Sequence, residues 1–350
     1  MRVVVATVQV PFARGGAELH AEGLRDALAA AGHEADIVAV PFNPSPPDRI
    51  PAQMLACRLL DLTESNGVPV DVVIGLKFPA YLAAHPRKVL WILHQHRPAY
   101  DLWGQTYGDL IYAPAGVQIR QTIRQADTQL IPQARGVFAN SRNVARRLKE
   151  HCGIDSAPLY HPPRHAEQFR CEAAEDYLFF PSRLAAIKRQ YLIVEALART
   201  RRPVRVRFAG AADFPPYQRE LQALARRLRV EDRAEWLGQV TEEDKRRLYA
   251  RALAVIYPPR DEDFGYVTLE AMLSAKPVLT CTDSGGPLEF VQPRQTGLVA
   301  EPTADDLAAA MDELWQERRQ AQAWGRAGRA HYERLGITWP KVVQRLLSCA

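Results

Sequence analysis

The feature that most constrains the fold is a regular alternation of short apolar segments with longer amphipathic ones. Runs such as RVVVATV (2–8) and VDVVIGL (70–76) are rich in β-branched residues, and segments with helical spacing follow them. The apolar runs predict buried strands and the intervening segments predict helices. Strands that alternate with helices are typical of parallel βαβ units in a doubly wound sheet.

The same alternation occurs twice along the 350 residues. In the first half, strands are expected at 2–8, 35–40, 70–76, 87–93 and 135–141, and helices at 17–32, 51–65, 115–133 and 143–151. In the second half, strands are expected at 177–184, 204–210, 234–238, 253–259, 276–282 and 297–302. The helices of that half are expected at 188–199, 217–230, 242–252, 267–275, 305–322 and 340–347.

A segment without period, residues 158–176, separates the two series and predicts a linker. We therefore expect an α/β chain of two Rossmann-like, doubly wound domains that face each other across a cleft. Residues 1–165 form the first domain and residues 166–335 the second. Residues 336–350 are expected to form a C-terminal helix that could pack back on the first domain. A cleft between such domains is the natural binding site.

Composition narrows the function classes. Hydrophobic residues make up 47% and charged residues 24%, as in soluble globular proteins, and the net charge is +5. The basic residues are scattered, so no nucleic-acid partner is expected. The densest basic stretch, residues 141–149, predicts a solvated helix face. The alternative is a face that meets an acidic substrate or an anionic membrane.

The cysteines and the apolar runs bear on the cellular compartment in which the protein is expected. Five cysteines without a CxxC pair argue against a disulfide framework and a zinc site, and favour reducing surroundings. The N-terminal apolar run lacks the length and cleavage site of a signal peptide, and no window has membrane-spanning length. A cytoplasmic protein is expected, with peripheral contact at the inner membrane face left open.

The segment RDEDFGYVTLEAML (260–273) combines acids with a Phe-Gly pair after a predicted strand. Gly265 would let the backbone approach a ligand, and Glu270, near a helix start, could accept hydrogen bonds from a ribose diol. The alternative is that Glu262 and Glu270 are surface acids favoured by the helix dipole. A divalent metal at Asp261–Asp263 is a weaker alternative, because no further oxygen-rich cluster is evident.

Cations and glycines follow other strands. Arg183 and Lys188 could neutralise a departing diphosphate, or simply face solvent. In RGGAE (14–18), Gly15 and Gly16 could bring backbone amides close to a phosphate, although the motif is not GxGxxG and glycine pairs also form plain turns. The loop SGGPLE (284–289) could likewise bring backbone amides close to a ligand, or form a plain turn.

Two histidines follow the fourth strand of the first half. His94 comes first after the strand and is preferred to His96 as a residue that faces the cleft, although lone histidines are often structural. With His96, the nearby Asp101 and Trp103 are candidates for an acceptor-binding pocket, on position alone. All these signals fall at strand ends on the same edge of two predicted sheets.

The segment PPRDEDFGYVTLEAMLSAKPVLTCTDSGGPLE (258–289) resembles the signature of retaining family 4 glycosyltransferases with the GT-B fold. FFPSRLAAIKR, GGAELH and VFANSRNVARRL are similar to further parts of that family, so the resemblance covers nearly the whole chain. One departure is Glu-Asp-Phe-Gly at 262–265, where the family often has Glu-Gly-Phe-Gly.

The resemblance implies roles for single residues. Arg183 and Lys188 would hold the diphosphate, Glu270 the ribose, and Glu262 the transferred sugar, while His94 would lie close to the anomeric centre. Catalysis would involve His94, Glu262, Arg183 and Lys188. The remaining donor-binding residues would be Gly15, Gly16, Gly210, Phe264, Gly265, Tyr266, Val267 and Glu270.

The resemblance implies a retaining hexosyltransferase that needs no metal or other cofactor. Its donor would be a nucleotide sugar, UDP-linked by default and GDP-linked as the alternative. Its acceptor would be a glycan, a lipid-linked saccharide or a small molecule, as in polysaccharide biosynthesis. Two alternatives stay open: a GT-B nucleotide-sugar epimerase, and a non-catalytic nucleotide-sugar-binding subunit of a transferase complex.

Overall fold

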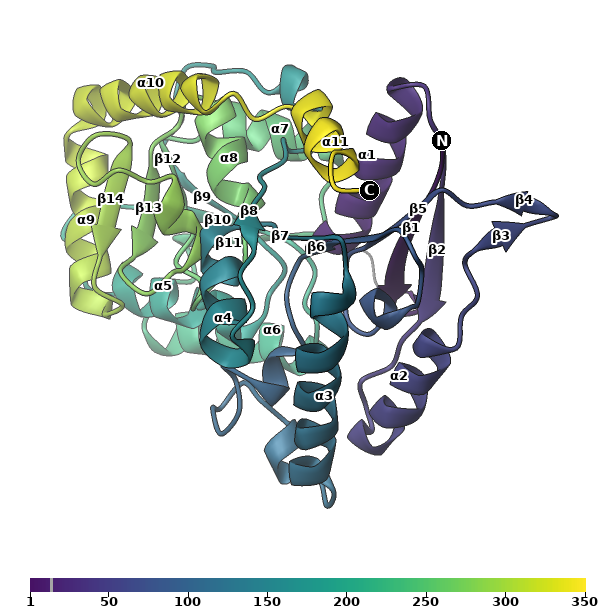
Figure 1. Ribbon diagram of the computed structural model, residues 1–350. Helices are drawn as coiled ribbons and strands as arrows, with labels where there is room; N and C mark the ends of the chain where they lie inside the picture. The colour runs from purple at the N-terminus through teal and green to yellow at the C-terminus, as the bar shows by residue number, and fades with distance from the viewer. Residues whose placement is uncertain (13–14) are drawn as a thin grey trace. The chain divides into compact units, whose positions relative to one another are not determined.

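The computed structural model describes residues 1–12 and 15–350. Their contacts divide into two compact units. Unit 1 comprises residues 1–164 and 337–350, and unit 2 comprises residues 165–336. The domain boundaries expected from the sequence lie after residues 165 and 335. Each unit is a Rossmann-like α/β domain built on one parallel sheet, as the fold-class prediction required (Figure 1).

The sheet of unit 1 has six parallel strands in the order β2-β1-β5-β6-β7-β8. Its inner strands are apolar because helices cover both faces of a parallel sheet; every residue of β5 and β6 is buried. The strands are β1 (Arg2–Gln9), β2 (Glu34–Pro41), β5 (Val72–Gly75), β6 (Lys88–Ile92), β7 (Gly136–Ala139) and β8 (Ala157–Pro158).

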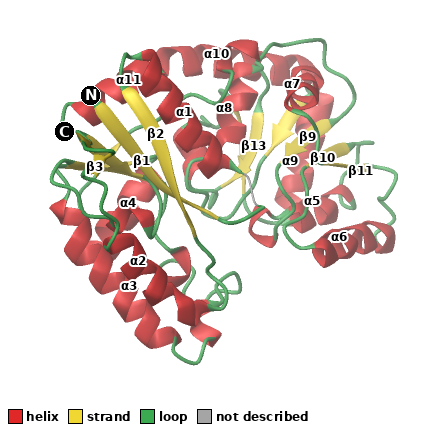
Figure 2. Cartoon of the chain, turned by 90° about the vertical axis from the view of Figure 1, so that its right-hand side faces the viewer, coloured by secondary structure: helices red, strands yellow, loops and turns green. Residues whose placement is uncertain are grey.

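In the part of unit 1 that the structure describes, five α-helices accompany this sheet: α1 (Gly16–Ala30), α2 (Ile50–Arg58), α3 (Gly116–Leu130), α4 (Arg142–Cys152) and α11 (Trp339–Leu347). Figure 2 shows α2 and α3 next to each other below the strands. The C-terminal helix α11 packs on α1, and its Val342, Val343 and Leu346 are buried in one core cluster with Leu24 and Trp91.

The sheet of unit 2 also has six parallel strands, in the order β11-β10-β9-β12-β13-β14. Counted from the start of the unit, this is the order 3-2-1-4-5-6 of the dinucleotide-binding fold. The strands are β9 (Leu178–Pro181), β10 (Val206–Ala209), β11 (Ala234–Gly238), β12 (Ala254–Ile256), β13 (Val278–Cys281) and β14 (Gly297–Ala300). The helices are α5 (Gln190–Leu197), α6 (Pro215–Arg227), α7 (Glu242–Arg251), α8 (Tyr266–Leu273), α9 (Ala304–Gln316) and α10 (Arg318–Leu335).

Short 3₁₀ turns complete the secondary structure at Pro47–Arg49, Ala80–Leu82, Arg97–Ala99, Leu110–Tyr112, Ile131–Gln133, Ala166–Gln168, Ala186–Lys188 (η7) and Gly286–Glu289 (η8). None of the helices in the described part of the chain combines the length and apolar character needed to cross a bilayer.

Several expected elements were wrong. Helix α2 ends at Arg58 rather than continuing to residue 65, and β3 (Glu64–Ser65) pairs with β4 (Val68–Pro69) in a hairpin around Asn66 and Gly67, which both have positive φ. The expected helix 305–322 is two helices, α9 and α10, with Glu317 between them. Pro158, expected in the linker, belongs to the edge strand β8.

The basic stretch 141–149 is not wholly a solvated face. Arg147 is only 4% exposed. One of its guanidinium nitrogens lies 3.7 Å from the Asp101 carboxylate. A buried arginine needs such a partner, and sequence spacing does not reveal a partner that lies on another segment.

Candidate functional site

In the sheet of unit 2, the strands after β9 are added first on one side of it, as β10 and β11, and then on the other side, as β12 to β14. The boundary between β9 and β12 is the switch point of the sheet. The loops that leave these two strands at their carboxyl ends therefore diverge, and open α/β sheets bind ligands at such a point. Residues 182–189 follow β9 and residues 257–265 follow β12. The predicted residues Arg183, Lys188, Glu262 and Gly265 all lie in these two loops.

Backbone hydrogen bonds hold the loops after β9, β12 and β13 together. The amide of Arg260 donates to the carbonyl of Ile187 at 2.9 Å, and the amide of Glu262 donates to the carbonyl of Ser284 at 2.9 Å. The amide of Gly286 donates back to the carbonyl of Glu262 at 2.8 Å. The loop that carries Glu262 is thus fixed on both sides, which limits the conformational entropy lost on ligand binding.

Lys188 and Glu262 come together at the centre of these loops. Lys188 ends the short turn η7 and is only 8% exposed. Its ammonium donates to the Glu262 carboxylate and, at 3.1 Å, to the hydroxyl of Tyr257. Burial, followed by the charge of Glu262, raises the pKa of Tyr257 well above its ordinary value, so this phenol stays protonated. The result is a buried cation held beside a carboxylate.

Glu270 lies on α8 and is 8% exposed. Its Oε2 accepts a hydrogen bond of 2.6 Å from the hydroxyl of Tyr249, and its Oε1 one of 3.1 Å from the ammonium of Lys245. Burial lowers the pKa of Lys245, but the charges of Glu270 and Glu242 outweigh this effect and raise it. Each carboxylate oxygen has two acceptor positions, so Glu270 could accept further bonds from a ligand diol.

The segment Phe264–Val267 leads into α8. Gly265 has φ +83°, and a Cβ there would lie 3.0 Å from the ring of Pro287, so both conformation and close packing require glycine. Phe264 is 3% exposed and meets Tyr266 edge to face, with ring centroids 5.2 Å apart. Val267 is buried as well. Of this segment, the backbone rather than the side chains is therefore suited to meet a ligand.

Arg183 is not part of the buried cluster. Its side chain is 61% exposed and pairs with Asp213 at 2.6 Å. Gly210 lies beneath this loop: its φ is +151°, and a Cβ would come 2.3 Å from the carbonyl oxygen of Ser182. Gly210 thus allows the loops after β9 and β10 to approach each other closely. Arg183 remains available to turn from Asp213 toward an anion.

In unit 1 the predicted glycines lie at the start of α1, after β1. Gly15 precedes the helix, and its amide donates to the Glu18 carboxylate at 2.7 Å. Gly16 is the first residue of α1. Because Glu18 already accepts from the Gly15 amide, an incoming anion would have to displace that carboxylate. Arg14 of the same motif lies outside the described residues.

The two histidines after β6 differ in surroundings. His94 is half-buried, and its Nδ1 lies 2.7 Å from the carbonyl oxygen of Gln95. A carbonyl only accepts, so Nδ1 carries the proton and Nε2 is the basic nitrogen. His96 is 9% exposed and packs against Phe78 and Phe42, and burial lowers its pKa to about 4. His96 would reach an acceptor only if this packing changed.

The other predicted acceptor residues also have protein partners. Asp101 forms a salt bridge of 2.6 Å with Arg97, besides its contact with Arg147. The guanidinium of Arg120 lies over the ring of Trp103, 4.6 Å from its centre. These contacts stabilise the segment after β6, and they do not by themselves indicate an acceptor pocket.

The sequence did not indicate a buried polar cluster around Asp127, beneath this segment. The Asp127 carboxylate is fully buried and accepts hydrogen bonds from the hydroxyls of Tyr81 (2.9 Å) and Tyr100 (2.8 Å). Burial raises its pKa to about 7, although these hydrogen bonds and one with Gln95 oppose the change. Gln95 lies between the two histidines, so the cluster supports the backbone that carries His94.

Sequence reasoning also missed the partners in unit 2: Tyr257, Tyr249, Lys245 and Asp213. Only Tyr257 had a local signal, as the residue that directly follows β12 at the ligand edge. Tyr249 and Lys245 lie on α7, where their spacing resembles that of any helix. Over residues 1–12 and 15–350, no group of three or more His, Cys, Asp or Glu side chains is arranged to hold a metal ion.

Comparisons with known proteins bear on the family and the fold of the chain. The family model described as "Glycosyl transferases group 1" matches residues 164–331, and the model "Glycosyltransferase Family 4" matches residues 14–163. D-rhamnosyltransferase WbpZ of Pseudomonas aeruginosa is 30% identical over 207 residues, which are 57% of this chain and 53% of that protein. The chain spans only 28% to 53% of the length of three curated relatives that it matches.

Solved structures share the fold over nearly the full length. Sucrose-phosphate synthase from Thermosynechococcus elongatus has a TM-score of 0.79 at 17% identity and covers 99% of this chain and 98% of its own. HepE of Anabaena, in complex with UDP and glucose, has a TM-score of 0.72 at 18% identity, with 99% of both chains covered. The two family models, which together match residues 14–331, and this shared fold show that the chain belongs to the family 4 glycosyltransferases of the GT-B fold.

Proposed function

We propose that the protein transfers a sugar from a nucleotide-sugar donor to a hydroxyl acceptor, with retention of the anomeric configuration. The observation that carries this proposal is the pair of buried acid–base contacts at the switch point of unit 2, Lys188 with Glu262 and Lys245 with Glu270. Relatives with glycosyltransferase names and a structural neighbour in complex with UDP-glucose support it.

The two pairs suit two parts of a nucleotide sugar, the charged diphosphate and the uncharged ribose. The ammonium of Lys188 would donate to the diphosphate and stabilise the charge that develops as this group leaves. Arg183 would add a second cation once it exchanges Asp213 for phosphate. Glu270 would accept from the ribose hydroxyls, and its bonds from Tyr249 and Lys245 would hold the carboxylate in position.

Glu262 would act on the sugar itself. Its carboxylate faces Lys188, so an incoming diphosphate would share the ammonium and leave Glu262 able to accept from sugar hydroxyls. We further propose that the leaving phosphate accepts the proton of the attacking hydroxyl, which requires no protein nucleophile and no metal ion. UDP is the proposed nucleotide and GDP the alternative; the acceptor would be a glycan, a lipid-linked saccharide or a small molecule.

The test measures nucleoside diphosphate release from a panel of UDP- and GDP-sugars, with and without candidate acceptors, in the presence of EDTA. Acceptor-dependent release of one nucleotide, with an α-configured product from an α-configured donor, is expected. Inversion of the anomeric centre would reject the retaining mechanism, and activity restored only by magnesium or manganese would reject metal independence. Donor binding without turnover for every acceptor would reject catalysis.

A further inference from the structure

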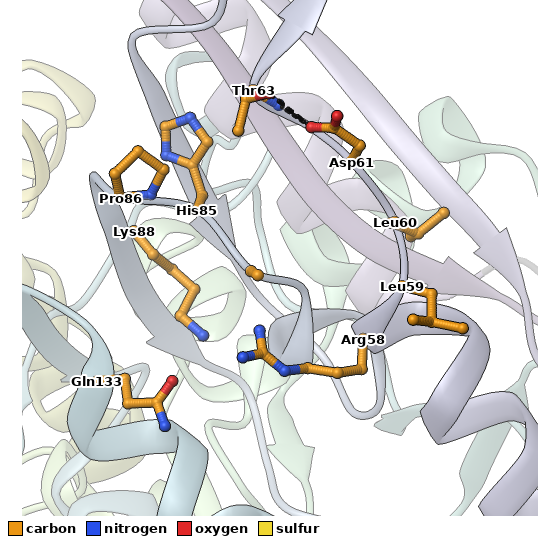
Figure 3. Close-up of a pocket in the computed structure, with 10 residues that line it drawn as sticks. Arg58, Leu59, Leu60, Asp61, Thr63, His85, Pro86, Lys88 and Gln133 are labelled. Atoms are coloured by element: carbon orange, nitrogen blue, oxygen red, sulfur yellow. Dashed lines mark hydrogen bonds between the residues drawn. The ribbon is translucent and has the colours of Figure 1, made fainter.

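Unit 1 contains a pocket of about 490 Å³ at the opposite edge of its sheet from His94. We refer to it as the basal pocket. It is lined by Arg58 at the end of α2 and residues 59–61 and 63 after it, by residues 84–86 before β6, by Lys88, and by Gln133 (Figure 3). Lys88 is the first residue of β6, whereas His94 follows the end of that strand. Because parallel α/β folds bind substrates at the carboxyl ends of strands, the basal pocket is separate from the site described above.

Two cations meet in this pocket, and neither has a carboxylate partner within residues 1–12 and 15–350. Lys88 is 3% exposed, and its ammonium donates only to the carbonyls of Ala83 (3.1 Å) and Tyr81 (3.4 Å) among the described residues. The half-buried Arg58 makes no hydrogen bond or salt bridge within the same part of the chain. Figure 3 shows the two charged ends turned toward each other.

The positive charge of Arg58 affects the pKa of Lys88. Burial, and next the proximity of Arg58, lower the pKa of Lys88 to about 8. Two like charges at a buried position are unfavourable unless an anion joins them. Bringing a negatively charged group between them would therefore remove a penalty already present in the unliganded protein.

Asp61 supplies a carboxylate to the lining of the pocket, but its described hydrogen bonds are with Thr63 and not with Arg58 or Lys88. Asp61 accepts from the amide (2.9 Å) and the hydroxyl (2.6 Å) of Thr63. His85 accepts from the amide of Arg87 through Nδ1 at 3.1 Å, so Nε2, 3.2 Å from the carbonyl of Val70, is the ring nitrogen that donates.

The walls of the pocket are partly apolar. Leu59, Leu60 and Pro86 line it, and Leu59 is 72% exposed. A volume of about 490 Å³ lies in the range of pockets that hold small organic ligands and exceeds what a single phosphate would fill. A fitting ligand has an anionic head and an uncharged body.

We propose that the basal pocket binds a phosphate monoester, with the phosphoryl group between Arg58 and Lys88 and the organic part against Leu59 and Pro86. Arginine pairs with two oxygens of a phosphoryl group at once, and lysine adds a point charge to a third. The phosphoryl group could belong to a soluble sugar phosphate or to a lipid headgroup, which present the same chemistry. This site does not depend on the proposed transfer reaction.

The experiment is isothermal titration calorimetry of the full chain with glucose 6-phosphate, inorganic phosphate and glucose, repeated with saturating UDP present. Vesicles containing phosphatidic acid form a separate arm, read by co-sedimentation. Arg58→Gln is the test variant, because its side chain is half-buried and holds no partner in the described residues. Arg49→Gln is the matched control: it lies exposed at the other end of α2.

The proposal expects glucose 6-phosphate to bind more tightly than inorganic phosphate, glucose not to bind, and UDP to leave the affinity unchanged. Arg58→Gln should weaken binding at least tenfold, and Arg49→Gln should not change it. Arg58-dependent binding to the vesicles alone would support the same site with a lipid as its ligand. Absence of binding to every phosphate monoester, equal affinity for inorganic phosphate, or affinity unaffected by Arg58→Gln would overturn the proposal.

Discussion

The two units bury charge in different ways. In unit 2 most of the buried charged side chains have an oppositely charged partner: Lys188 pairs with Glu262, Glu270 with Lys245, and Arg189 with the exposed Asp283 at 2.5 Å. Unit 1 buries Asp127, Lys88, His96 and His20, none of which forms a salt bridge within the described residues. Exceptions exist in both: Arg147 and Asp101 interact in unit 1, and Lys276 of unit 2 donates to a carbonyl.

This difference has two consequences. The paired side chains present fixed, oriented polarity to a charged ligand, which suits the unit that we propose binds the diphosphate. Buried single groups instead shift their pKa toward the neutral form. We therefore expect the stability of unit 1 to depend on pH more than that of unit 2, and variants can test this contrast one group at a time.

The largest expected effect comes from Asp127→Asn. The folded-state pKa of Asp127 is raised to about 7, so its contribution to stability is full at pH below about 4 and is lost as the pH rises through 7. Relative to wild type, the variant should gain about 4 kcal/mol in unfolding free energy between pH 4 and pH 8. Urea unfolding at several pH values, with hydrogen exchange in β6 to locate the effect, measures this gain.

The test depends on how the unfolding free energy of Asp127→Asn changes with pH. Its absolute value matters less, because asparagine loses one of the hydrogen bonds from Tyr81 and Tyr100 at every pH. A wild-type-to-variant difference that stays constant with pH would show that Asp127 is ionised in the folded protein and would remove the contrast between the units.

In unit 2, Lys188→Ala should lower turnover by a factor of about 10² to 10³, because the cation that stabilises the leaving diphosphate is gone. Steady-state kinetics with the donor identified by the screen measures this loss. Arg199→Ala is the control, since Arg199 pairs with Asp305 on the surface of the same unit. Equal activity of the two variants would contradict the role of Lys188.

His96→Leu tests unit 1 in the opposite pH direction. The folded-state pKa of His96 is lowered to about 4, so its contribution to stability is full above about 6.5 and is lost as the pH falls through 4. Relative to wild type, the variant should gain about 3 kcal/mol between pH 7 and pH 4. Urea unfolding in acetate and phosphate buffers measures this gain. If the unfolding free energy of the variant changes with pH as that of wild type does, the protonated ring of His96 lies within reach of water.

The smallest expected effect is that of Asp213→Ala. Its salt bridge with Arg183 is solvent-exposed, so the unfolding free energy should change by less than about 1 kcal/mol. Removal of the competing carboxylate should leave Arg183 free for phosphate and strengthen nucleotide binding slightly. A loss of several kcal/mol in unfolding free energy would show that this pair is part of the folded core.

The strand pattern predicted most of the fold because parallel strands are buried on both faces and read as continuous apolar runs. The wrong predictions come from single residues or short turns inside a helical pattern. A hairpin turn at Asn66–Gly67 lies in or next to one region expected as a helix, and Glu317 interrupts another. In the candidate site, Arg183, Lys188 and Glu262 follow strand ends, so their position at the carboxyl edge of the sheet of unit 2 could be predicted. Their partners Tyr249, Lys245 and Asp213 could not, because contacts between distant segments leave no periodic signal.

Unit 1 was harder to interpret for the same physical reason. His94 and His96 occupy neighbouring positions in sequence, yet one is half-buried and the other lies against Phe42 and Phe78. Asp127 looks like any acid on an amphipathic helix, although it is fully buried under the segment after β6. Only the packing of separate segments distinguishes these roles.

The most direct test of the central claim is calorimetric titration of wild type, Glu270→Gln and the surface variant Glu235→Gln with UDP and GDP. The account predicts that one nucleotide binds wild type and Glu235→Gln with equal affinity, and that Glu270→Gln binds it at least tenfold more weakly because a ribose acceptor is lost. Unchanged affinity in Glu270→Gln, or no binding of either nucleotide to wild type, would contradict the assignment of the donor to the switch point of unit 2.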